Sequence, residues 1–516
     1  MTGIGDGDRL VLIVGAGPTG LSLALQLATR GIACRIIDKA HSAGETSRAM
    51  GVQARTLEFY RQLGIADEVV ARGTPMDVIR IRDGVRNVAR IAFRDMGDAL
   101  SPYPYMLGFP QDEHERFLIE KLAQYGVHVE RDTELVDFTQ DADDIRATLR
   151  SLTGGDIVCR ARYLCGCDGA HSTVRERAGI GFEGGTYPQL FWLADVHATG
   201  KPVGEMFARI DAQAMALMMT VRTSGTQRLV GFLPPDLSVK ADLTFSDVRP
   251  MVERMLGVII ERVEWFSTYR VHHRVVDRFR DGRVFLLGDA GHVHSPAGGQ
   301  GMNTGIGDAV NLGWKLSHVI AGRANVTLLD TYEPERIAFA RKLVATTDTT
   351  FSVLADQGLT GTILRKWVIP RVAPLVTRLR FVRRMMFRVV SQIRIEYRDS
   401  ALSDGRAGKI CAGDRLPWVT TPDGDNFEPL SSMDWQVHVY GHAVDALRNA
   451  CRTAGLAMYV MPWSKAAADA GMVRDAWYLV RPDGYIAVAA ADQMVGRLES
   501  YIAKFSLRFE AAVTSR

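Results

Sequence analysis

The feature that most constrains the fold of this chain is a glycine pattern near its start. Residues 15–20 read Gly-Ala-Gly-Pro-Thr-Gly and follow the apolar run 9–14, whose branched residues are typical of a buried parallel strand. A helical pattern over 21–30 and a second apolar run over 33–37 come next. We therefore predict a strand, a tight turn, a helix and a parallel strand, which form a βαβ unit of about 30 residues.

The spacing of the three glycines indicates what this turn can bind. Gly15 permits the tight turn, Gly17 lets the backbone approach a pyrophosphate, and Gly20 allows the helix to pack closely on the strand. The pyrophosphate would lie at the positive end of the helix, and Asp38 at the end of the second strand can accept hydrogen bonds from a ribose. An acid here favours FAD or NAD over NADP. The alternative is a glycine turn with a structural role only.

A second glycine-rich segment follows the strand predicted over 284–287. It begins with Gly288 and Asp289 and continues as Pro-Ala-Gly-Gly-Gln-Gly-Met-Asn over 296–303, before a helix predicted over 308–320. Its backbone N–H groups suit a ring that becomes anionic, as reduced flavin does, and Asp289 can accept a hydrogen bond from a ribityl hydroxyl. A glycine-rich helix entry with a buried Asp cap is the other interpretation.

A third motif follows the strand predicted over 161–165. It consists of Asp168 and a glycine, with Arg175 seven residues after the acid, and on its own it is also a common turn. Cys165 and Cys167 form a Cys-x-Cys pair without a second Cys or His pair, so we predict no metal site. The sequence holds neither a second Gly-x-Gly-x-x-Gly nor a Cys-x-x-Cys, which leaves one dinucleotide site and no redox thiol pair.

Composition limits the partners of the chain. A net charge of +3 over 516 residues gives no strong field to recruit nucleic acid. No run reaches the roughly 18 uncharged apolar residues of a membrane span, and the start does not resemble a signal peptide. We therefore expect a soluble protein of the cytoplasm without nucleic-acid or membrane partners. Residues 361–398 combine arginines with apolar residues and predict either a helical segment with solvated arginines or a helix for a membrane surface or partner.

Taken together, the three motifs resemble the class A flavoprotein monooxygenases, and most of all the branch of phenol hydroxylases and pentachlorophenol monooxygenases. The likeness runs from Arg9 to about Arg341. The segments that carry it are SRAMGVQARTLEFY (47–60), QDEHERFL (111–118), CDGAHSTVR (167–175), GRVFLLGDAGHVHSPAGGQGMNTGIGDAVNLGWKL (282–316) and LLDTYEPER (328–336). The segment WYLVRPDGYIAV (477–488) is similar to the thioredoxin-like tail of the same branch.

The resemblance implies an α/β architecture in four parts. A Rossmann-like FAD-binding domain would comprise residues 1–184 and 275–345, interrupted by a mostly antiparallel substrate-binding sheet at 185–274. A helical segment at 346–399 and a separable thioredoxin-like domain at 400–516 would complete the chain.

The family pattern also implies which residues would hold FAD. They are Gly15, Gly17, Pro18, Thr19, Gly20, Asp38, Lys39, Arg48, Gln111, Asp168, Asp289, Pro296, Gly299, Gly301, Met302 and Asn303. Arg48 and Gln111 stand where the family reaches FAD phosphate and ribityl atoms, and Asp168 where it links FAD with NAD(P)H. Pro296 and residues 299–303 would line the isoalloxazine ring. A surface ion pair for Arg48 and a polar helix start for Gln111 remain alternatives.

The resemblance implies a reaction as well. NADPH or NADH would act as a transient reductant of FAD, O₂ would form a flavin C4a-hydroperoxide, and this would hydroxylate a phenolic or related aromatic ring. We therefore predict an FAD-dependent NAD(P)H aromatic monooxygenase whose partners are an aromatic small molecule, O₂ and NAD(P)H. If the chain associates with itself, we expect a homodimer. Epoxidation or olefin reduction by a related flavoenzyme, and a flavin-binding protein without enzymatic activity, are the alternatives.

The family pattern does not identify residues for the substrate or for proton transfer. Candidates for an apolar substrate wall in the predicted sheet are Trp192, His197, Met215 and Met219, although core packing explains each of them better. His292 and His294 flank the second glycine-rich segment and are candidates to move a phenol proton. A hydrogen-bonded structural histidine explains either of them equally well.

Overall fold

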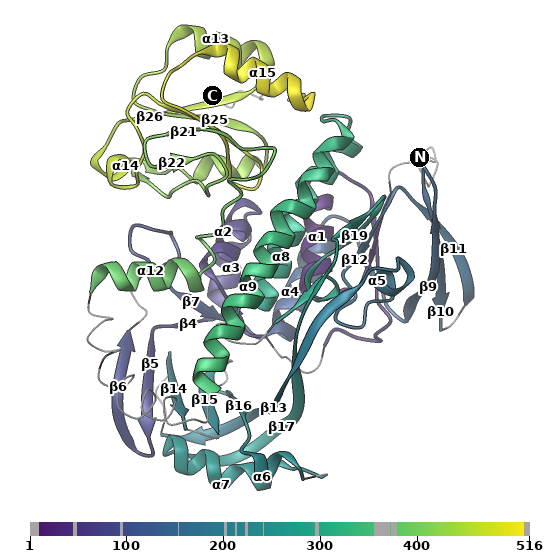
Figure 1. The fold of residues 1–516 in the computed structure, drawn as a ribbon, viewed down its shortest axis with the longest axis vertical. Coiled ribbons are helices and arrows are strands. Elements are labelled where there is room, and N and C mark those ends of the chain that lie inside the picture. Colours follow the sequence, from purple (N-terminus) through teal and green to yellow (C-terminus); the bar gives the residue numbers. More distant parts are fainter. Residues whose placement is uncertain are drawn as a thin grey trace.

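The chain forms three tiers, which Figure 1 shows from the smaller α/β unit at the top to a large antiparallel sheet at the bottom. The structure is a computed structural model. It describes residues 10–44, 49–92, 96–152, 154–200, 204–211, 214–221, 225–240, 242–294, 299–355, 372 and 379–509, with the backbone alone for 345–355.

The middle tier is built on a six-stranded sheet in the order β18-β19-β12-β1-β2-β8, parallel except for β18. Its strands are β1 (Val11–Val14), β2 (Cys34–Ile37), β8 (Val129–Glu130), β12 (Tyr163–Gly166), β18 (Arg280–Asp281) and β19 (Val284–Leu286). Helix α1 (Pro18–Ala28) packs against both α4 (Gln111–Ala123) and α8 (Gly301–Ile320). The four residues of β1 are all buried, as a central parallel strand requires. The predicted βαβ unit at the start of the chain is confirmed.

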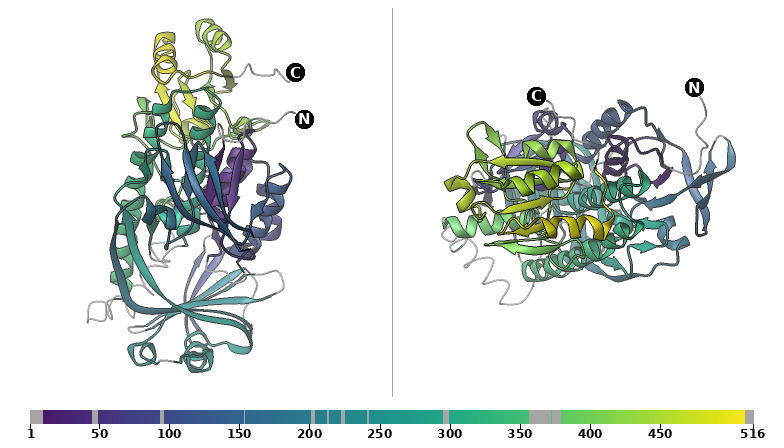
Figure 2. Two further views of the ribbon diagram at one scale, coloured as in Figure 1. Left: turned by 90° about the vertical axis from the view of Figure 1, so that its right-hand side faces the viewer. Right: turned by 90° about the horizontal axis from the view of Figure 1, so that it is seen from above.

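The bottom tier is an eight-stranded sheet in the order β20-β17-β13-β16-β15-β14-β5-β6. Its strands are β5 (Val78–Asp83), β6 (Arg86–Ala92), β13 (Phe182–Thr199), β14 (Glu205–Ile210), β15 (Met215–Thr220), β16 (Gln227–Phe232), β17 (Ile259–Val276) and β20 (His292–Val293). Figure 2 shows the long strands β13 and β17 running up into the middle tier. The sheet is therefore larger than the predicted range 185–274. Strand β5 joins it by a parallel pairing with the distant β14, for which no local sequence signal exists.

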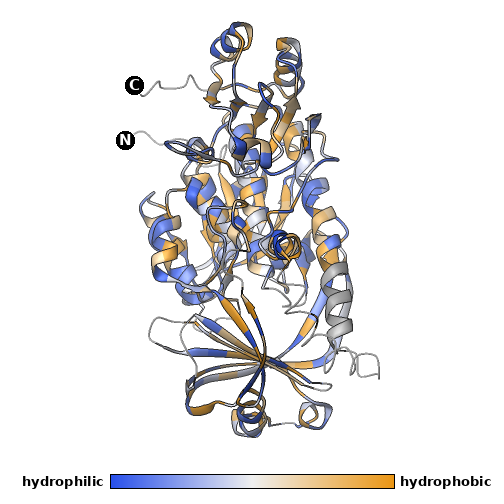
Figure 3. Cartoon of the chain, turned by 90° about the vertical axis from the view of Figure 1, so that its left-hand side faces the viewer, coloured by the Kyte–Doolittle hydropathy of each residue, from blue (hydrophilic) through white to orange (hydrophobic). Residues whose placement is uncertain are grey.

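Side chains along β15 alternate between the two faces of this sheet, as the period of a strand requires. Ala216 and Met218 belong to a core shared with helix α7 (Phe245–Leu256). Leu217 and Met219 belong to a cluster of methionines on the opposite face. Both faces of β15 are therefore apolar, and Figure 3 shows orange, hydrophobic residues along strands of this sheet.

The top tier is a six-stranded sheet in the order β22-β21-β28-β27-β25-β26. Its elements are β21 (Asp404–Ala407), β22 (Ile410–Cys411), β25 (Gln436–Tyr440), α13 (Asp445–Ala454), β26 (Ala457–Met461), α14 (Lys465–Asp469), β27 (Trp477–Val480), β28 (Ile486–Ala490) and α15 (Val495–Phe505). Strand β25 is parallel to β26 and antiparallel to β27.

Shorter elements connect the tiers. They are α2 (Ala54–Gln62), α3 (Ala66–Arg72), α5 (Thr173–Arg177), α6 (Pro235–Ser238), α9 (Tyr332–Ala355), α12 (Arg380–Val390), β3 (Gly51–Val52), β4 (Thr74–Met76), β7 (Met106–Gly108), β9 (Thr133–Gln140), β10 (Ile145–Ser151), β11 (Gly155–Ala161), β23 (Thr420–Thr421), β24 (Gly424–Asp425), η1 (Gly288–Ala290), η2 (Val326–Thr331) and η4 (Glu428–Ser432). Within the described ranges, no helix has the length and apolar character needed to cross a bilayer.

Buried ion pairs fix the top tier to the middle tier. Arg481, which follows β27, donates to both carboxylate oxygens of Glu335 on α9, at 2.7 and 3.0 Å. Lys315 on α8 donates to the same carboxylate at 2.8 Å, and Arg481 also bonds Asp483 at 2.6 Å. Burial alone would raise the pKa of Glu335, but the charges of Arg481 and Lys315 outweigh it and hold the pKa below its ordinary range.

A second buried cluster lies between the same two tiers. Glu58 on α2 accepts hydrogen bonds from Arg415 at 2.6 and 2.8 Å, and from Arg55 at 2.8 Å. Removal of the top tier would leave Glu58 without Arg415, and buried charges without partners are strongly destabilising. The top tier has its own sheet, and these buried ion pairs join it to the middle tier, so its separability from the rest stays a prediction.

Candidate active site

Packing within the protein requires two of the three glycines in the turn between β1 and α1. Gly15 has a φ of +102°, and a Cβ there would lie 2.3 Å from the carbonyl oxygen of Cys167. A Cβ on Gly20 would lie 2.0 Å from the carbonyl oxygen of Gly15. Any larger residue at either position would force backbone apart, so both glycines hold the helix close to the strands.

Gly17 is different, because the protein's own packing does not require a glycine there. Its φ is −77°, which any residue can adopt, and a Cβ would meet no atom of the chain within 4 Å. Helix α1 begins at the next residue, Pro18, and in the described chain it has neither a capping side chain nor an acid in its first turn. Open space in front of an uncapped helix N-terminus is what a pyrophosphate needs, so these residues fit the diphosphate of FAD.

Asp38 closes the same turn from the end of β2. Its carboxylate accepts hydrogen bonds from the backbone N–H groups of Ala16 at 2.6 Å and Ala40 at 2.8 Å. The guanidinium of Arg131 lies 3.7 Å from it. The carboxylate is thereby fixed beside the glycine turn, where a ribose can donate to its remaining lone pairs. Lys39 is exposed next to it.

Thr19 joins the first glycine turn to the second glycine-rich segment. A Cβ on Gly288 would lie 2.6 Å from Thr19 Oγ1, and a Cβ on Gly305 would lie 2.2 Å from the same atom. Packing between η1 and α8 therefore accounts for the Thr19 side chain, which we had predicted to contact the cofactor. Asp289, in the middle of η1, is exposed. That exposure excludes the buried helix cap that was the alternative for Asp289.

Helix α8 begins at Gly301, although the sequence predicted a start at Asp308. The N–H groups in the first turn of a helix have no partner within the helix, and among the described residues no acid lies in this turn. Gly299, just before it, has a φ of +61°, and a Cβ there would meet nothing within 4 Å. The backbone from Gly299 to Met302 therefore presents an open, positively polarised helix end, which fits the anionic edge of a reduced flavin.

The side chain of Asn303 has a structural role that the sequence did not reveal. Its amide nitrogen donates to the carbonyl oxygens of Gly51 at 2.7 Å and Gly299 at 3.0 Å. Its amide oxygen accepts from the Gln53 backbone N–H and the Thr56 hydroxyl, both at 2.8 Å. These four bonds use the capacity of the amide, so only the backbone of Asn303 can line the isoalloxazine ring.

Asp308 holds the second glycine-rich segment from behind. This buried carboxylate accepts from the Gly288 N–H at 2.9 Å and from Arg336 Nε at 2.6 Å, and His292 Nε2 lies 2.7 Å away. Burial alone would raise the pKa of Asp308, but the charges of Arg336 and His292 outweigh it and lower the pKa. His292 is thus a buried residue bonded to Asp308, as its structural interpretation requires, and its role in proton transfer stays a prediction.

The third motif packs directly against the second. Asp168 accepts hydrogen bonds from the Ser172 hydroxyl at 2.5 Å and from the Val174 N–H at 3.2 Å. Burial raises its pKa. Arg175 donates to the carbonyl oxygen of Ala290 in η1 at 3.1 Å. The three motifs therefore meet at the carboxyl ends of β1, β12 and β19, the edge where open α/β sheets bind ligands.

Four of the predicted residues remain to be placed. Gln111 is the first residue of α4 and bonds Glu115 at 2.9 Å, as a polar helix start does. His294 lies near the open end of α8, with its Nε2 3.6 Å from the position of a Cβ on Gly301. Arg48 and Pro296 lie outside the described residues. No group of three His, Cys, Asp or Glu side chains suited to a metal occurs in the part of the chain that the structure describes.

One of the four predicted substrate residues lies on the face of the sheet that packs against α7. Trp192 is buried in the core shared with α7, as the core-packing alternative for this residue requires. His197 lies 2.7 Å from Glu264 and 2.8 Å from Arg262 in a partly exposed charged group, which is not an apolar wall. Met215 and Met219 lie on the opposite face. Their apolar neighbours there are Met50, Met76, Tyr187, Phe191, Met206, Val221, Phe232 and Val271.

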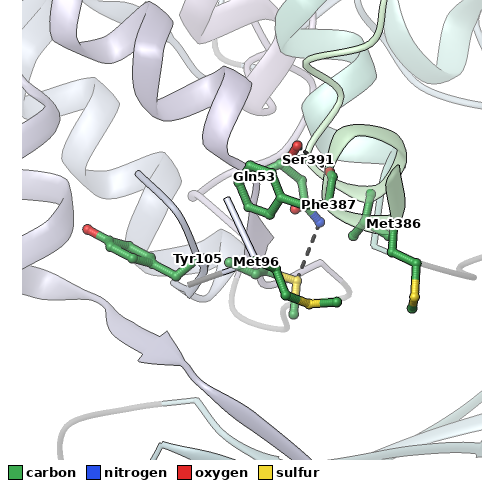
Figure 4. A pocket seen from close by; sticks show the side chains of 8 residues that line it. Gln53, Met96, Tyr105, Met386, Phe387 and Ser391 are labelled. Atoms are coloured by element: carbon green, nitrogen blue, oxygen red, sulfur yellow. Dashed lines mark hydrogen bonds between the residues drawn. The ribbon is translucent and has the colours of Figure 1, made fainter. Parts of the chain in front are cut away.

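A narrow cavity lies between α2, β7 and α12 (Figure 4). It is lined by Gln53, Met96, Tyr105, Met106, Met386, Phe387, Val390 and Ser391. The side chain of Gln53 donates to Met106 Sδ at 3.4 Å, and Met106 also packs against the methionine cluster of the sheet. The Gln53 backbone is bonded to Asn303 near the start of α8. The cavity therefore lies between the start of α8 and the methionine cluster of the sheet. Gln53 lies in one of the segments that carry the family resemblance, and four lining residues from Met386 to Ser391 lie in the arginine-rich segment 361–398, which the sequence did not link to a pocket.

These features define a dinucleotide-binding flavoprotein whose flavin motifs adjoin an apolar sheet. Residues 8–347 match the family model described as FAD binding domain. A flavin-dependent monooxygenase of Mycobacteroides abscessus is 34% identical over 496 residues, which cover 93% of this chain and 96% of that protein. Pentachlorophenol 4-monooxygenase of Sphingobium chlorophenolicum is 32% identical over 419 residues, which cover 80% of this chain and 76% of that protein.

Solved structures show the same likeness. Aklavinone-11 hydroxylase, in a ternary complex with FAD and aklavinone, matches with a TM-score of 0.77 and 25% identity over 97% of this chain and 99% of that one. The chain belongs to the FAD binding domain family and is an FAD-dependent monooxygenase of the aromatic hydroxylase class. The predictions of the family, of FAD as cofactor and of an aromatic hydroxylase are confirmed.

Proposed function

We propose that this enzyme hydroxylates a phenolic substrate with several fused rings, with NADPH or NADH and O₂ as co-substrates. Aklavinone-11 hydroxylase and this chain cover each other almost completely, at 97% and 99%. The solved structure of p-nitrophenol 4-monooxygenase of Pseudomonas putida, which is named for a single-ring phenol, covers 72% of this chain with a TM-score of 0.61. The agreement over the full length with the enzyme of a fused-ring compound supports the larger substrate.

The observation that carries the proposal is the methionine-rich face of the sheet. Met50, Met76, Met206 and Met219 form one apolar cluster, and Met106 adjoins it and also lines the cavity. Methionine side chains are flexible and polarisable, so they can adapt to a broad, flat apolar ring system. Ligand pockets of this kind combine an apolar lining with a few polar groups that fix orientation.

Arg228 supplies such a polar group on the same face. It is the direct cross-strand neighbour of Met219 and forms a bidentate pair with Asp195 at 2.7 and 2.8 Å. Its side chain is buried, and its Nη1 has no hydrogen-bond partner among the described residues. A buried donor without a partner is costly, so a phenolate or carbonyl oxygen of the substrate is a suitable acceptor.

We further propose the roles of the chain around FAD. The turn at Gly17 would hold the diphosphate, Asp38 the ribose, Asp289 the ribityl chain, and residues 299–303 the ring through their backbone. Bound FAD would supply hydride acceptance from NAD(P)H and the activation of O₂. The chain then has to orient the phenol through Arg228 and to exclude water with the methionine cluster.

We also propose the assignment of the tiers. Residues 1–184 and 275–345 would form the FAD-binding domain, and 185–274, with β5 and β6, the substrate sheet. Residues 346–399 would be the helical connection. The order β25-α13-β26-α14-β27-β28-α15 supports a thioredoxin-like domain for residues 400–516.

The test is a comparison of single-ring phenols with fused-ring phenols, with anhydrotetracycline as the fused-ring probe. We expect fused-ring phenols to accelerate NAD(P)H oxidation and to gain one oxygen atom by mass. Arg228→Lys keeps the charge but not the two-pronged pairing, and we expect it to raise KM more than it lowers kcat. Products that gain two hydrogen atoms without oxygen would favour olefin reduction. Turnover of single-ring phenols alone would contradict the fused-ring proposal.

A further inference from the structure

Among the described residues, helix α12 (Arg380–Val390) packs against the rest of the protein through the side that carries Phe387. Figure 1 shows it at the left edge of the molecule with its axis directed outward, and Figure 3 shows it end-on, facing the viewer. Phe387 is its one buried residue and packs on Gly97, where a Cβ would come within 2.4 Å of the ring. Phe387 and its neighbours Met386 and Val390 line the cavity, whereas the residues of the outer side of α12 do not.

The outer side of α12 carries an exposed apolar stripe. Phe381, Met385 and Val389 are 77%, 45% and 41% exposed, and Leu379 just before the helix is 59% exposed. Residues four apart lie on the same side of a helix, so the three helical residues form one continuous row. Single exposed apolar residues are ordinary, but a row of this kind marks an interaction surface.

A row of arginines runs beside this stripe. Arg380, Arg384 and Arg388 are exposed, have the same four-residue spacing and each immediately precede one of the apolar residues. The charges that act on Arg388 come from Arg384, Arg394 and Arg415. Residues 361–395 contain nine Lys and Arg residues and no Asp or Glu. The outer side of α12 is therefore apolar and cationic, without carboxylates of its own segment to neutralise it.

We propose that α12 docks the protein on the surface of an anionic phospholipid bilayer. The apolar row would enter the boundary between headgroups and acyl chains, while Arg384 and Arg388 pair with lipid phosphates. An exposed amphipathic helix with arginines beside large apolar residues has the composition of interfacial helices. Each cationic side chain near an anionic membrane adds attraction, and the guanidinium suits phosphate oxygens.

Other occupants fit this surface less well. A symmetric dimer through α12 would place the same surface on both sides of the contact and so bring arginine rows into opposition. Nucleic acid would neutralise the arginines but would leave Phe381 and Met385 without an apolar environment. A membrane surface accommodates both rows at once. The docking is independent of the proposed substrate, because it uses the side of α12 that faces away from the cavity.

The test is co-sedimentation of the FAD-loaded enzyme with phospholipid vesicles. We expect binding to phosphatidylcholine vesicles that contain about one third phosphatidylglycerol, weaker binding as salt rises, and little binding to pure phosphatidylcholine. The double variant R384Q/R388Q should bind roughly thirtyfold more weakly, given about 1 kcal/mol for each arginine. The double variant F381S/M385S should lose binding to the same vesicles, because it removes buried apolar area.

A matched control removes two exposed arginines elsewhere. R86Q/R90Q changes the net charge equally, but on strand β6, and should bind vesicles as the wild type does. All variants should keep their FAD and their melting temperature, which separates lost docking from misfolding. The proposal is overturned if the wild type ignores anionic vesicles or if R384Q/R388Q binds them like the control. Self-association or binding of duplex DNA in place of vesicle binding would overturn it as well.

Discussion

Replacement of Glu335 by Gln tests how the top tier is fixed to the flavin-binding tier. Glu335 accepts hydrogen bonds from Arg481 at 2.7 and 3.0 Å and from Lys315 at 2.8 Å. It also accepts from Asn311 at 2.7 Å and from the Ser400 hydroxyl at 2.6 Å. A glutamine has nearly the same shape but no charge. Glu335→Gln therefore leaves two buried cations without their shared anion, while the packing volume is kept.

The expected loss is about 3–5 kcal/mol, the cost of breaking a buried ion pair by removal of one partner. Globular proteins unfold with an entropy of about 2.1 cal/mol/K per residue, so this loss corresponds to a melting temperature lower by roughly 3–5 °C for a chain of this length that unfolds as one unit. The measurement is calorimetry at neutral pH. The control is Asp156→Asn, which breaks the exposed pair of Asp156 with Arg150 and should not shift the melting temperature.

The pH dependence gives the same prediction an independent check. Glu335 has a pKa below its ordinary value of 4.5 in the folded chain, so the unfolded chain takes up the proton first as the pH falls. The stability that the carboxylate contributes is thus present above about pH 4.5 and is lost at lower pH. The difference in melting temperature between the wild type and Glu335→Gln should therefore become smaller below about pH 4.5. Equal melting temperatures of the variant and the wild type at neutral pH would refute the role assigned to this network.

Three further predictions concern the flavin site and the top tier. Asp289→Ala should weaken FAD binding by about 1–3 kcal/mol, tenfold to a hundredfold, because one bond to a ribityl hydroxyl is lost; an unchanged dissociation constant in a fluorescence titration would exclude Asp289 as a ligand. The double variant Cys411→Ser/Cys451→Ser should keep the turnover per bound FAD, because burial raises the pKa of the Cys451 thiol to about 11 and so disfavours the reactive thiolate. Its melting temperature should fall, because Cys451 is buried. A large loss of turnover at full FAD content would indicate redox chemistry. Anaerobic stopped-flow should show reduction by NAD(P)H at least ~10-fold faster with a substrate that is hydroxylated, about 1.4 kcal/mol in barrier height; equal rates would refute substrate gating.

The local part of the flavin site could be predicted from the sequence. The run from 9 to 38 encodes strand, turn, helix and acid within one short stretch, and all of these interactions form between near neighbours. Asp168, Asp289 and Gly288 were found in the same way, because each directly follows a buried strand. The family pattern then supplied the cofactor and the reaction.

The features of the fold and the site that the sequence did not predict depend on contacts between segments that lie far apart in the chain. The pairing of β5 with β14 and the bond from Asn303 to Gly51 join residues far apart in the chain, so no local pattern announces them. Helix α8 begins early because its glycines, which suggested a loop, pack on Thr19 and Arg336 inside a helix. Arg481 lies in the segment WYLVRPDGYIAV, and only the tertiary structure shows that it is buried against Glu335.

The central claim is that the open space before α1 holds the diphosphate of FAD, and Gly17→Ala tests it most directly. A Cβ at this position meets no protein atom within 4 Å, so the melting temperature of the apoprotein should not change. Titration of apoprotein with FAD should nevertheless show at least ~10-fold weaker binding than for the wild type, about 1.4 kcal/mol, because the methyl group enters the space of the diphosphate. An unchanged dissociation constant for FAD in a stable Gly17→Ala protein would contradict the assignment of this site.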